Sequence, residues 1–164
     1  MATGTVILPV QAAKISGAYV GSTPSIDGGS GAWKLLYDAS TEEEALWQFR
    51  LPVNYSTTPV MKLQYSMASA TSGSVAWNVE IMAVTPGNSE TIDTTSFDAV
   101  NVGSGAVAGS AGQVNEISVT LSSVDSMAAN DAILLKISRN PADAGDTATG
   151  DAELLTASFE YTTS

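Results

Sequence analysis

Residues 46–51 read LWQFRL, and this alternation of apolar and polar side chains decides the fold class. In a β-strand successive side chains point to opposite faces, so Trp47, Phe49 and Leu51 share one face, opposite Gln48 and Arg50. The same period of two recurs in residues 61–67, which read MKLQYSM. Strands with one buried and one solvated face are typical of antiparallel sheets.

Other stretches carry the same signal, and helical periodicity is almost absent. They are residues 5–10, 75–81, 117–121, 133–139 and 154–161. Only residues 123–129 could form a helical turn. Many short strands with Gly, Pro and Ser between them predict an all-β fold, a two-sheet antiparallel β-sandwich that is jelly-roll-like. The predicted core residues are Trp47, Phe49, Leu63, Tyr65, Trp77, Val79, Ile81, Ile117, Val119, Leu135, Ile137 and Phe159.

The chain divides unequally. Residues 1–31 are poor in charge and end in GGSG, which predicts an N-terminal arm or edge strand joined flexibly to a single β-sandwich domain over residues 32–164. Alternatively, the apolar residues of the arm pack as the first strand of the sandwich. Residues 70–74 separate two clear strands and predict a hairpin loop, while residues 102–113 and 140–151 predict long, glycine-containing excursions.

Composition excludes several partners. The 164 residues are 44% hydrophobic and 14% charged, with six basic against seventeen acidic side chains and a net charge of −11. Binding to nucleic acid or to an anionic membrane needs clustered Lys and Arg, but the six here are scattered singly. We therefore expect no nucleic acid and no membrane partner. We find no signal peptide and no membrane span, and expect synthesis in a cytoplasm.

The absence of His and Cys removes most enzyme chemistry. A Ser-His-Asp or Cys-His constellation is impossible, and histidine-based metal sites are excluded. Glycoside hydrolysis needs only two carboxylates. However, Glu80, Glu116 and Glu160 occupy outward strand positions, where a solvated acid is the ordinary expectation. The sequence predicts no enzyme activity, no catalytic residue, no cofactor and no metal site.

One acidic loop could favour calcium. Residues 143–153 contain Asp143, Asp146, Asp151 and Glu153, and calcium prefers oxygen ligands from a flexible loop. The spacing does not match an EF-hand, and turns use Asp and Gly for backbone reasons. We therefore expect a structural turn held by its backbone, with calcium at most a weak stabiliser. The run of residues 42–44 is likewise predicted to be a solvated turn.

Aromatic residues raise the possibility of sugar binding, because sugars stack on aromatic faces. Trp47 and Trp77 lie in register with apolar strand residues and are predicted to be core, while Trp33 is less determined. The tyrosines that could be exposed do not group into a platform. They are Tyr19, Tyr37 and Tyr55.

Three stretches resemble small β-sandwich virion proteins of tailed bacteriophages. They are residues 37–52 (YDASTEEEALWQFRLP), residues 63–73 (LQYSMASATSG) and the segment 139–153. The resemblance implies a non-enzymatic capsid decoration or cement protein. It would lie in the virion as a homotrimer bound to the major capsid protein or another virion protein, with residues 1–31 loose until they order against the shell. The alternatives are a carbohydrate-binding or host-adsorption module associated with a fibre or tail, and a secreted or cell-surface β-sandwich.

Overall fold

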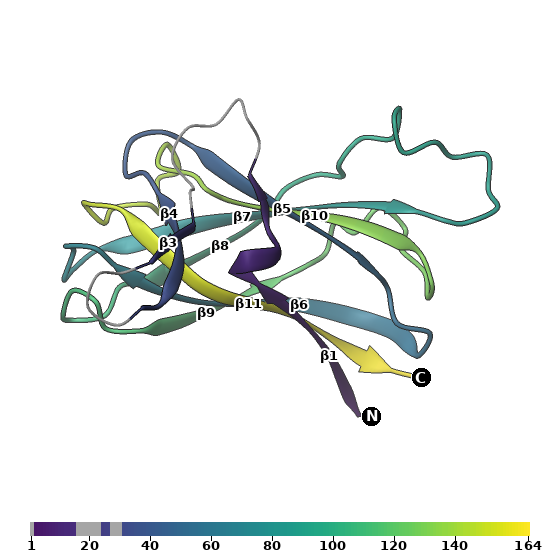
Figure 1. Ribbon diagram of the computed structural model, residues 1–164, viewed down its shortest axis with the longest axis horizontal. Coiled ribbons are helices and arrows are strands. Elements are labelled where there is room, and N and C mark those ends of the chain that lie inside the picture. Colours follow the sequence, from purple (N-terminus) through teal and green to yellow (C-terminus); the bar gives the residue numbers. More distant parts are fainter. Residues whose placement is uncertain (1, 16–23, 27–30) are drawn as a thin grey trace.

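Two antiparallel sheets face each other across one core, as the two layers of strands in Figure 1 show. The structure is a computed structural model that describes residues 2–15, 24–26 and 31–164. The predicted all-β, two-sheet antiparallel β-sandwich is confirmed. No helix in the described part of the chain has the length and apolarity needed to span a bilayer.

The sheets have six and five strands, which we call sheet A and sheet B. The strands of sheet A are β1 (Thr3–Pro9), β3 (Pro24–Ile26), β4 (Trp33–Tyr37), β6 (Tyr55–Met67), β9 (Asn115–Thr120) and β11 (Ala152–Thr163). The strands of sheet B are β2 (Lys14–Ile15), β5 (Glu43–Arg50), β7 (Ser74–Val84), β8 (Asn101–Ala106) and β10 (Ala132–Arg139). A short 3-10 helix, η1 (Val10–Ala12), connects β1 to β2.

The core contains the residues that the strand phasing predicts. Of the twelve, all are buried except Phe49, which is half-buried and packs against the ring of Phe159 at 5.6 Å between centroids. Trp77 is fully buried, with its ring edge-on to Tyr37 and Tyr65 at 5.0 and 5.5 Å. Its indole nitrogen has no hydrogen-bond partner.

Most connections cross from one sheet to the other. From β4 to β7 the chain alternates between sheets A and B, so β6 pairs with β11 and β9 while β7 pairs with β10 and β8. The predicted hairpin at residues 70–74 is therefore wrong. Both strands have large apolar inner faces, and burying these faces against each other across the core stabilises the sandwich more than hairpin pairing.

The described part of the N-terminal segment adds strands to both sheets. β1 pairs with β11 over seven residues, and Leu8 and Val10 are buried in the core. β2 pairs with β5, and β3 pairs with β4. The expectation that residues 1–31 are held loosely is wrong for β1, since its inner side chains complete the core. The GGSG joint lies mostly outside the described residues.

At one edge of the sandwich the two sheets lie close together, and two glycines without side chains make room for this approach. A Cβ on Gly103 of β8 would lie 2.7 Å from Val119 Cγ2, and a Cβ on Gly105 would lie 3.1 Å from Ile117 Cδ1. Val119 and Ile117 belong to β9 in the opposite sheet. Glycine thus lets the edge strands of the two sheets approach each other closely.

Residues 123–129, which could have formed a helical turn, form none. Asp125 and Ser126 have φ of 50° and 53°, which breaks helical geometry, and the Asp125 carboxylate instead accepts a hydrogen bond from the backbone N–H of Ala83 at 2.8 Å. At the same end of the molecule, the loop 85–100 extends outward from the end of β7 (Figure 1).

Candidate functional site

A groove lies on the outer face of sheet B, the face turned away from the core. It consists of two hollows that share Gln48, with volumes of about 640 and 300 Å³. The larger is lined by Gln48, Phe49, Arg50, Pro86, Asn130 and Ala132, and the smaller by Ala12, Lys14, Leu46, Trp47, Gln48 and Leu134. We call the two together the sheet groove.

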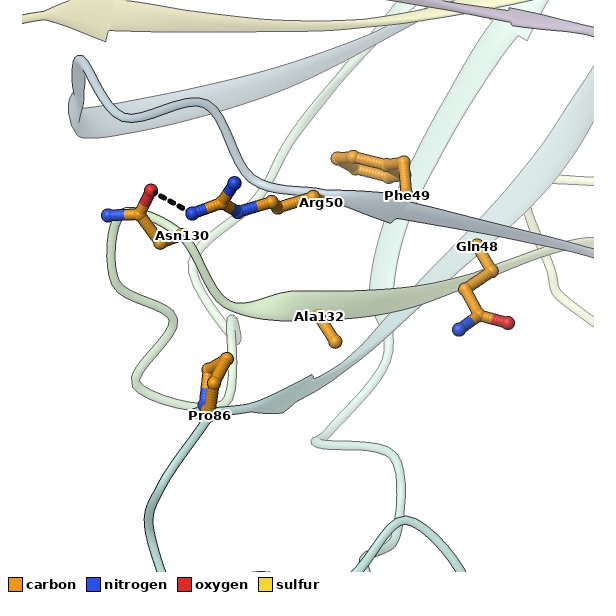
Figure 2. Close-up of a pocket in the computed structure, with 6 residues that line it drawn as sticks. All are labelled: Gln48, Phe49, Arg50, Pro86, Asn130 and Ala132. Carbon is orange, nitrogen blue, oxygen red and sulfur yellow. Dashed lines mark hydrogen bonds between the residues drawn. The ribbon is translucent and has the colours of Figure 1, made fainter.

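Strand alternation and register place the polar residues of the groove. Because Trp47 points into the core, Gln48 and Arg50 point outward on β5. On β10, Leu134 pairs with Gln48 and Ala132 pairs with Arg50, so these apolar side chains form a floor beside the two polar ones. In Figure 2 the Gln48 amide and the Ala132 methyl lie on one side of the strands and the Phe49 ring on the other. The arrangement places hydrogen-bonding groups over an apolar surface.

One end of the groove is held by a hydrogen bond between side chains. Arg50 Nη2 donates to Asn130 Oδ1 at 2.7 Å (Figure 2). Asn130 has a φ of 78°, and its backbone N–H donates to the carbonyl of Leu51 at 3.1 Å. The carbonyl of Asp131 accepts from the N–H of Leu51 at 2.8 Å. These bonds fix the 128–131 turn against the end of β5. The Arg50 guanidinium is therefore held in one orientation before any ligand binds.

The opposite end of the same face is acidic. Lys136 Nζ lies 2.8 Å from Glu80 Oε1 and 3.5 Å from Glu44 Oε2, and the ring of Phe97 lies 4.9 Å from the ammonium. Burial disfavours the charged amine, but the hydrogen bond and charge of Glu80, together with Glu44, outweigh it and raise the pKa of Lys136. The outer face of sheet B therefore changes character along β5, from acidic near Glu44 to basic and amide-bearing near Arg50.

The acidic loop 143–153 is organised around a residue that sequence analysis had placed only as a strand end. Arg139 is fully buried and donates from Nε and Nη2 to the two carboxylate oxygens of Asp146 at 2.9 and 2.8 Å. Its remaining donors reach the carbonyls of Ala148 at 2.9 Å and Gly150 at 2.7 Å. The guanidinium thus binds four oxygens of the loop. Within the described residues, no three acidic side chains are grouped as metal ligands would be.

The run at residues 42–44 is not a solvated turn throughout. Glu43 is 4% exposed, and its Oε2 accepts the backbone N–H of Asp38 at 2.9 Å. Burial raises the pKa of Glu43, and the charges of Asp38 and Asp151 raise it further. Glu44 is half-buried and forms an ion pair with Lys136. Of the three glutamates in this run, Glu42 is therefore the one that is exposed. The alternation of β5 explains the difference, because Glu43 shares the inward face with Ala45 and Trp47.

The aromatic side chains form no exposed platform in the described part of the chain. Trp47 and Trp77 are core, as predicted, and Trp33 is 41% exposed at the start of β4. The expectation that Tyr37 could be exposed is wrong, since its hydroxyl donates to the buried carbonyl of Ile137 at 3.4 Å. Tyr55 is half-buried and Tyr19 lies outside the described residues.

The sequence matches no protein-family profile and no curated protein. The fold, however, is shared with solved carbohydrate-binding modules. One is the CBM36-1 domain of a multidomain xylanase from the hindgut metagenome of Trinervitermes trinervoides, with 8% identity, a TM-score of 0.51, and coverage of 95% of this chain and 96% of that one. Another is the non-crystalline cellulose specific module CBM28, with 12% identity, a TM-score of 0.55, and coverage of 93% and 89%.

These neighbours correct the main functional expectation. The bacteriophage resemblance implied a capsid decoration or cement protein, whereas the two solved structures named above, which share the fold, are carbohydrate-binding modules. The capsid assignment is therefore wrong, and the alternative that sequence analysis left open is the better supported. The expected homotrimer, virion partner and virion location stay predictions, as does the absence of enzyme activity.

Proposed function

We propose that this protein is a non-catalytic carbohydrate-binding module that binds a glycan chain along the sheet groove. The observation that carries the proposal is the groove itself. Gln48, Arg50 and Asn130 provide amide and guanidinium groups beside the aliphatic side chains of Leu134 and Ala132. A sugar ring presents the complementary surface, with hydroxyl groups at its rim and C–H groups on its faces. Polar groups placed over an apolar floor are the usual composition of a small-molecule site.

The fold supports the same function. The two structural neighbours named above are a module of a xylanase and a module specific for non-crystalline cellulose. Since fold alone does not determine function, their titles support a class of ligand and no particular one. The open form of the groove across β5 and β10 suits an extended chain better than an enclosed single sugar.

The composition of the groove supports binding without catalysis. Hydrolysis of a glycosidic bond needs a pair of carboxylates beside the scissile bond. The described residues that line the two hollows include no Asp and no Glu. Glu44 and Glu80, at the acidic end of the same face, are bound to Lys136. The groove thus provides groups that hold a glycan and none that transfers a proton near neutral pH.

The test is affinity gel electrophoresis against a panel of soluble polysaccharides, followed by calorimetry on those that retard the protein. We expect Gln48→Ala to weaken binding about three- to tenfold, the loss of one or two hydrogen bonds. The matched control is Gln64→Ala on the outer face of sheet A, where Gln64 Nε2 donates to Glu116 at 3.0 Å. Retention of binding by the Gln48 variant with loss by the Gln64 variant would place the site on the other sheet. Failure to bind any polysaccharide would refute the proposed function.

A further inference from the structure

The pairing of the basic residues singles out the sheet groove. Four of the six Lys and Arg side chains are ion-paired with a carboxylate. They are Lys34 with Glu153, Lys62 with Glu116, Lys136 with Glu44 and Glu80, and Arg139 with Asp146. Among the described residues, Lys14 and Arg50 form no ion pair. Both line the groove.

This distribution is informative because acids outnumber bases seventeen to six. Cations in such a chain readily find a carboxylate, and four of the six do, three at the surface and Arg139 in the interior. Lys14 and Arg50 instead line a groove whose described lining residues include no carboxylate. At physiological ionic strength the Debye length is about 8 Å, so charges farther from the groove than this act on a ligand much less than Lys14 and Arg50, which line it. A ligand in the groove therefore meets two cations and no carboxylate among the described lining residues.

The two cations lie on neighbouring strands of one face, at a spacing that suits an extended chain. Lys14 of β2 pairs with Leu46 of β5, and Arg50 is four residues further along the same strand. At about 3.3 Å per residue this separates the two positions by roughly 13 Å, more than one sugar ring. Gln48 lies between them on the same face. The order along the groove is thus cation, amide, cation.

Arg50 is also prepared to bind an anion. Asn130 holds one amino group of the guanidinium through the 2.7 Å hydrogen bond, while the side chain itself is exposed. A planar guanidinium oriented in this way binds carboxylate or sulfate through two parallel hydrogen bonds. Toward the other end, Glu44 and Glu80 would repel an anionic chain beyond Lys14. The favourable path therefore runs from Lys14 past Gln48 to Arg50 and Asn130.

We propose that the sheet groove selects an anionic polysaccharide, whose acidic groups pair with Arg50 and Lys14. This inference rests on the proposed carbohydrate-binding function and specifies the class of glycan. The acidic group can be a carboxylate of a uronic acid or a sulfate ester, since a guanidinium binds either. Neutral glycans of the same backbone are expected to bind more weakly, because they gain the Gln48 contacts without the two charge-assisted bonds.

The test compares ligands that differ only in charge. Polygalacturonate is paired with its fully methyl-esterified form, and a sulfated galactan with its desulfated form. Calorimetry with the full chain should give roughly tenfold tighter binding to at least one acidic member than to its neutral partner. Arg50→Gln and Lys14→Gln should each remove most of that preference. Lys62→Gln, which removes a paired lysine from sheet A, should leave it unchanged.

The outcomes separate the two proposals. Preference for the carboxylated pair alone assigns a uronic acid, and preference for the sulfated pair alone assigns a sulfate ester. Equal affinity for acidic and neutral members overturns the anionic selectivity while the carbohydrate-binding function stands. An acidic preference that survives in both Arg50→Gln and Lys14→Gln overturns the assignment of the groove. Because both side chains are exposed, thermal melts of these variants should match the parent and exclude misfolding as the cause.

Discussion

Replacing Arg139 by Met is expected to destabilise the protein more than any surface change. Arg139 is fully buried at the end of β10, where it pairs with Trp77 of β7. The substitution keeps a long apolar stem but removes the guanidinium. It therefore tests whether the loop 140–151 is fixed by this one cation.

The expected cost follows from what the loop would lose. Asp146 is 3% exposed, and without Arg139 its carboxylate keeps one hydrogen bond, from the backbone N–H of Ala76 at 3.0 Å. The carbonyls of Ala148 and Gly150 would lose the guanidinium donor as well. Breaking a buried ion pair by removing one partner costs about 3–5 kcal/mol. That is a large part of the roughly 5–15 kcal/mol that stabilises a domain of this kind.

The assay is urea denaturation at pH 7, followed by tryptophan fluorescence. Arg139→Lys keeps the charge but not the planar fork and should fall between the parent and the Met variant. In a double-mutant cycle with Asp146→Asn, the two losses should be less than additive, because both remove the same pair. The surface control Lys62→Met should change stability by about 0.5 kcal/mol or less. A cost below about 1 kcal/mol for Arg139→Met would refute the reasoning.

Three further outcomes are expected. Trp77→Ala should lower the free energy of unfolding by about 3–5 kcal/mol, because the side chain is fully buried. Trp77→Phe should cost clearly less, because it keeps a ring in the core and removes an indole N–H that has no acceptor. Equal costs for the two variants in urea titrations would contradict this. Since the folded-state pKa of Glu43 lies above its ordinary value of 4.5, its contribution is most favourable below that pH and is lost as pH rises through the raised pKa. Glu43→Gln should therefore raise stability near neutral pH and flatten the dependence in melts from pH 4 to 8, and an unchanged slope would argue against burial of the charge. Chelator treatment should leave the melting temperature unchanged because Arg139 already binds the oxygens of the 140–151 loop, whereas a drop reversed by calcium would show a metal site there.

Most of the long strands and the core could be predicted because their signal is local. The exception among the longer strands of sheet B is β8 (Asn101–Ala106), most of which was expected to belong to a loop over residues 102–113, because its glycines hide the alternation. Alternation along β5 and β6 fixes which side chains share a face, and eleven of the twelve predicted core residues are buried. Strand partners could not be predicted, because a period of two is the same for a hairpin and for strands in opposite sheets. Extending the alternation of residues 46–51 back by three residues would have placed Glu43 on the inward face. The prediction of a solvated turn at residues 42–44 did not take this alternation into account.

The site could be predicted only in its parts. Outward Gln48 and Arg50 follow from the strand pattern, but their grouping with Lys14 and Asn130 depends on the pairing of β2 with β5 and on the 128–131 turn. The role of Arg139 likewise depends on a loop folding back over the end of the core. The bacteriophage resemblance was misleading for a related reason. The segments that carry it consist of strand-forming and turn-forming residues, which occur in β-sandwiches of many functions.

The pairing of β1 with β11 has a practical consequence. The backbone N–H of Thr163 donates to the carbonyl of Ala2 at 3.0 Å, so the two ends of the chain lie side by side (Figure 1). Both strands belong to sheet A, whereas the sheet groove lies on the outer face of sheet B. Immobilising the protein on a sensor surface, or fusing it to another domain, through either end therefore leaves the groove facing away from the attachment. A short peptide could also join the two ends, with new termini opened in the projecting loop 85–100, and yield a circular permutant that keeps both sheets intact.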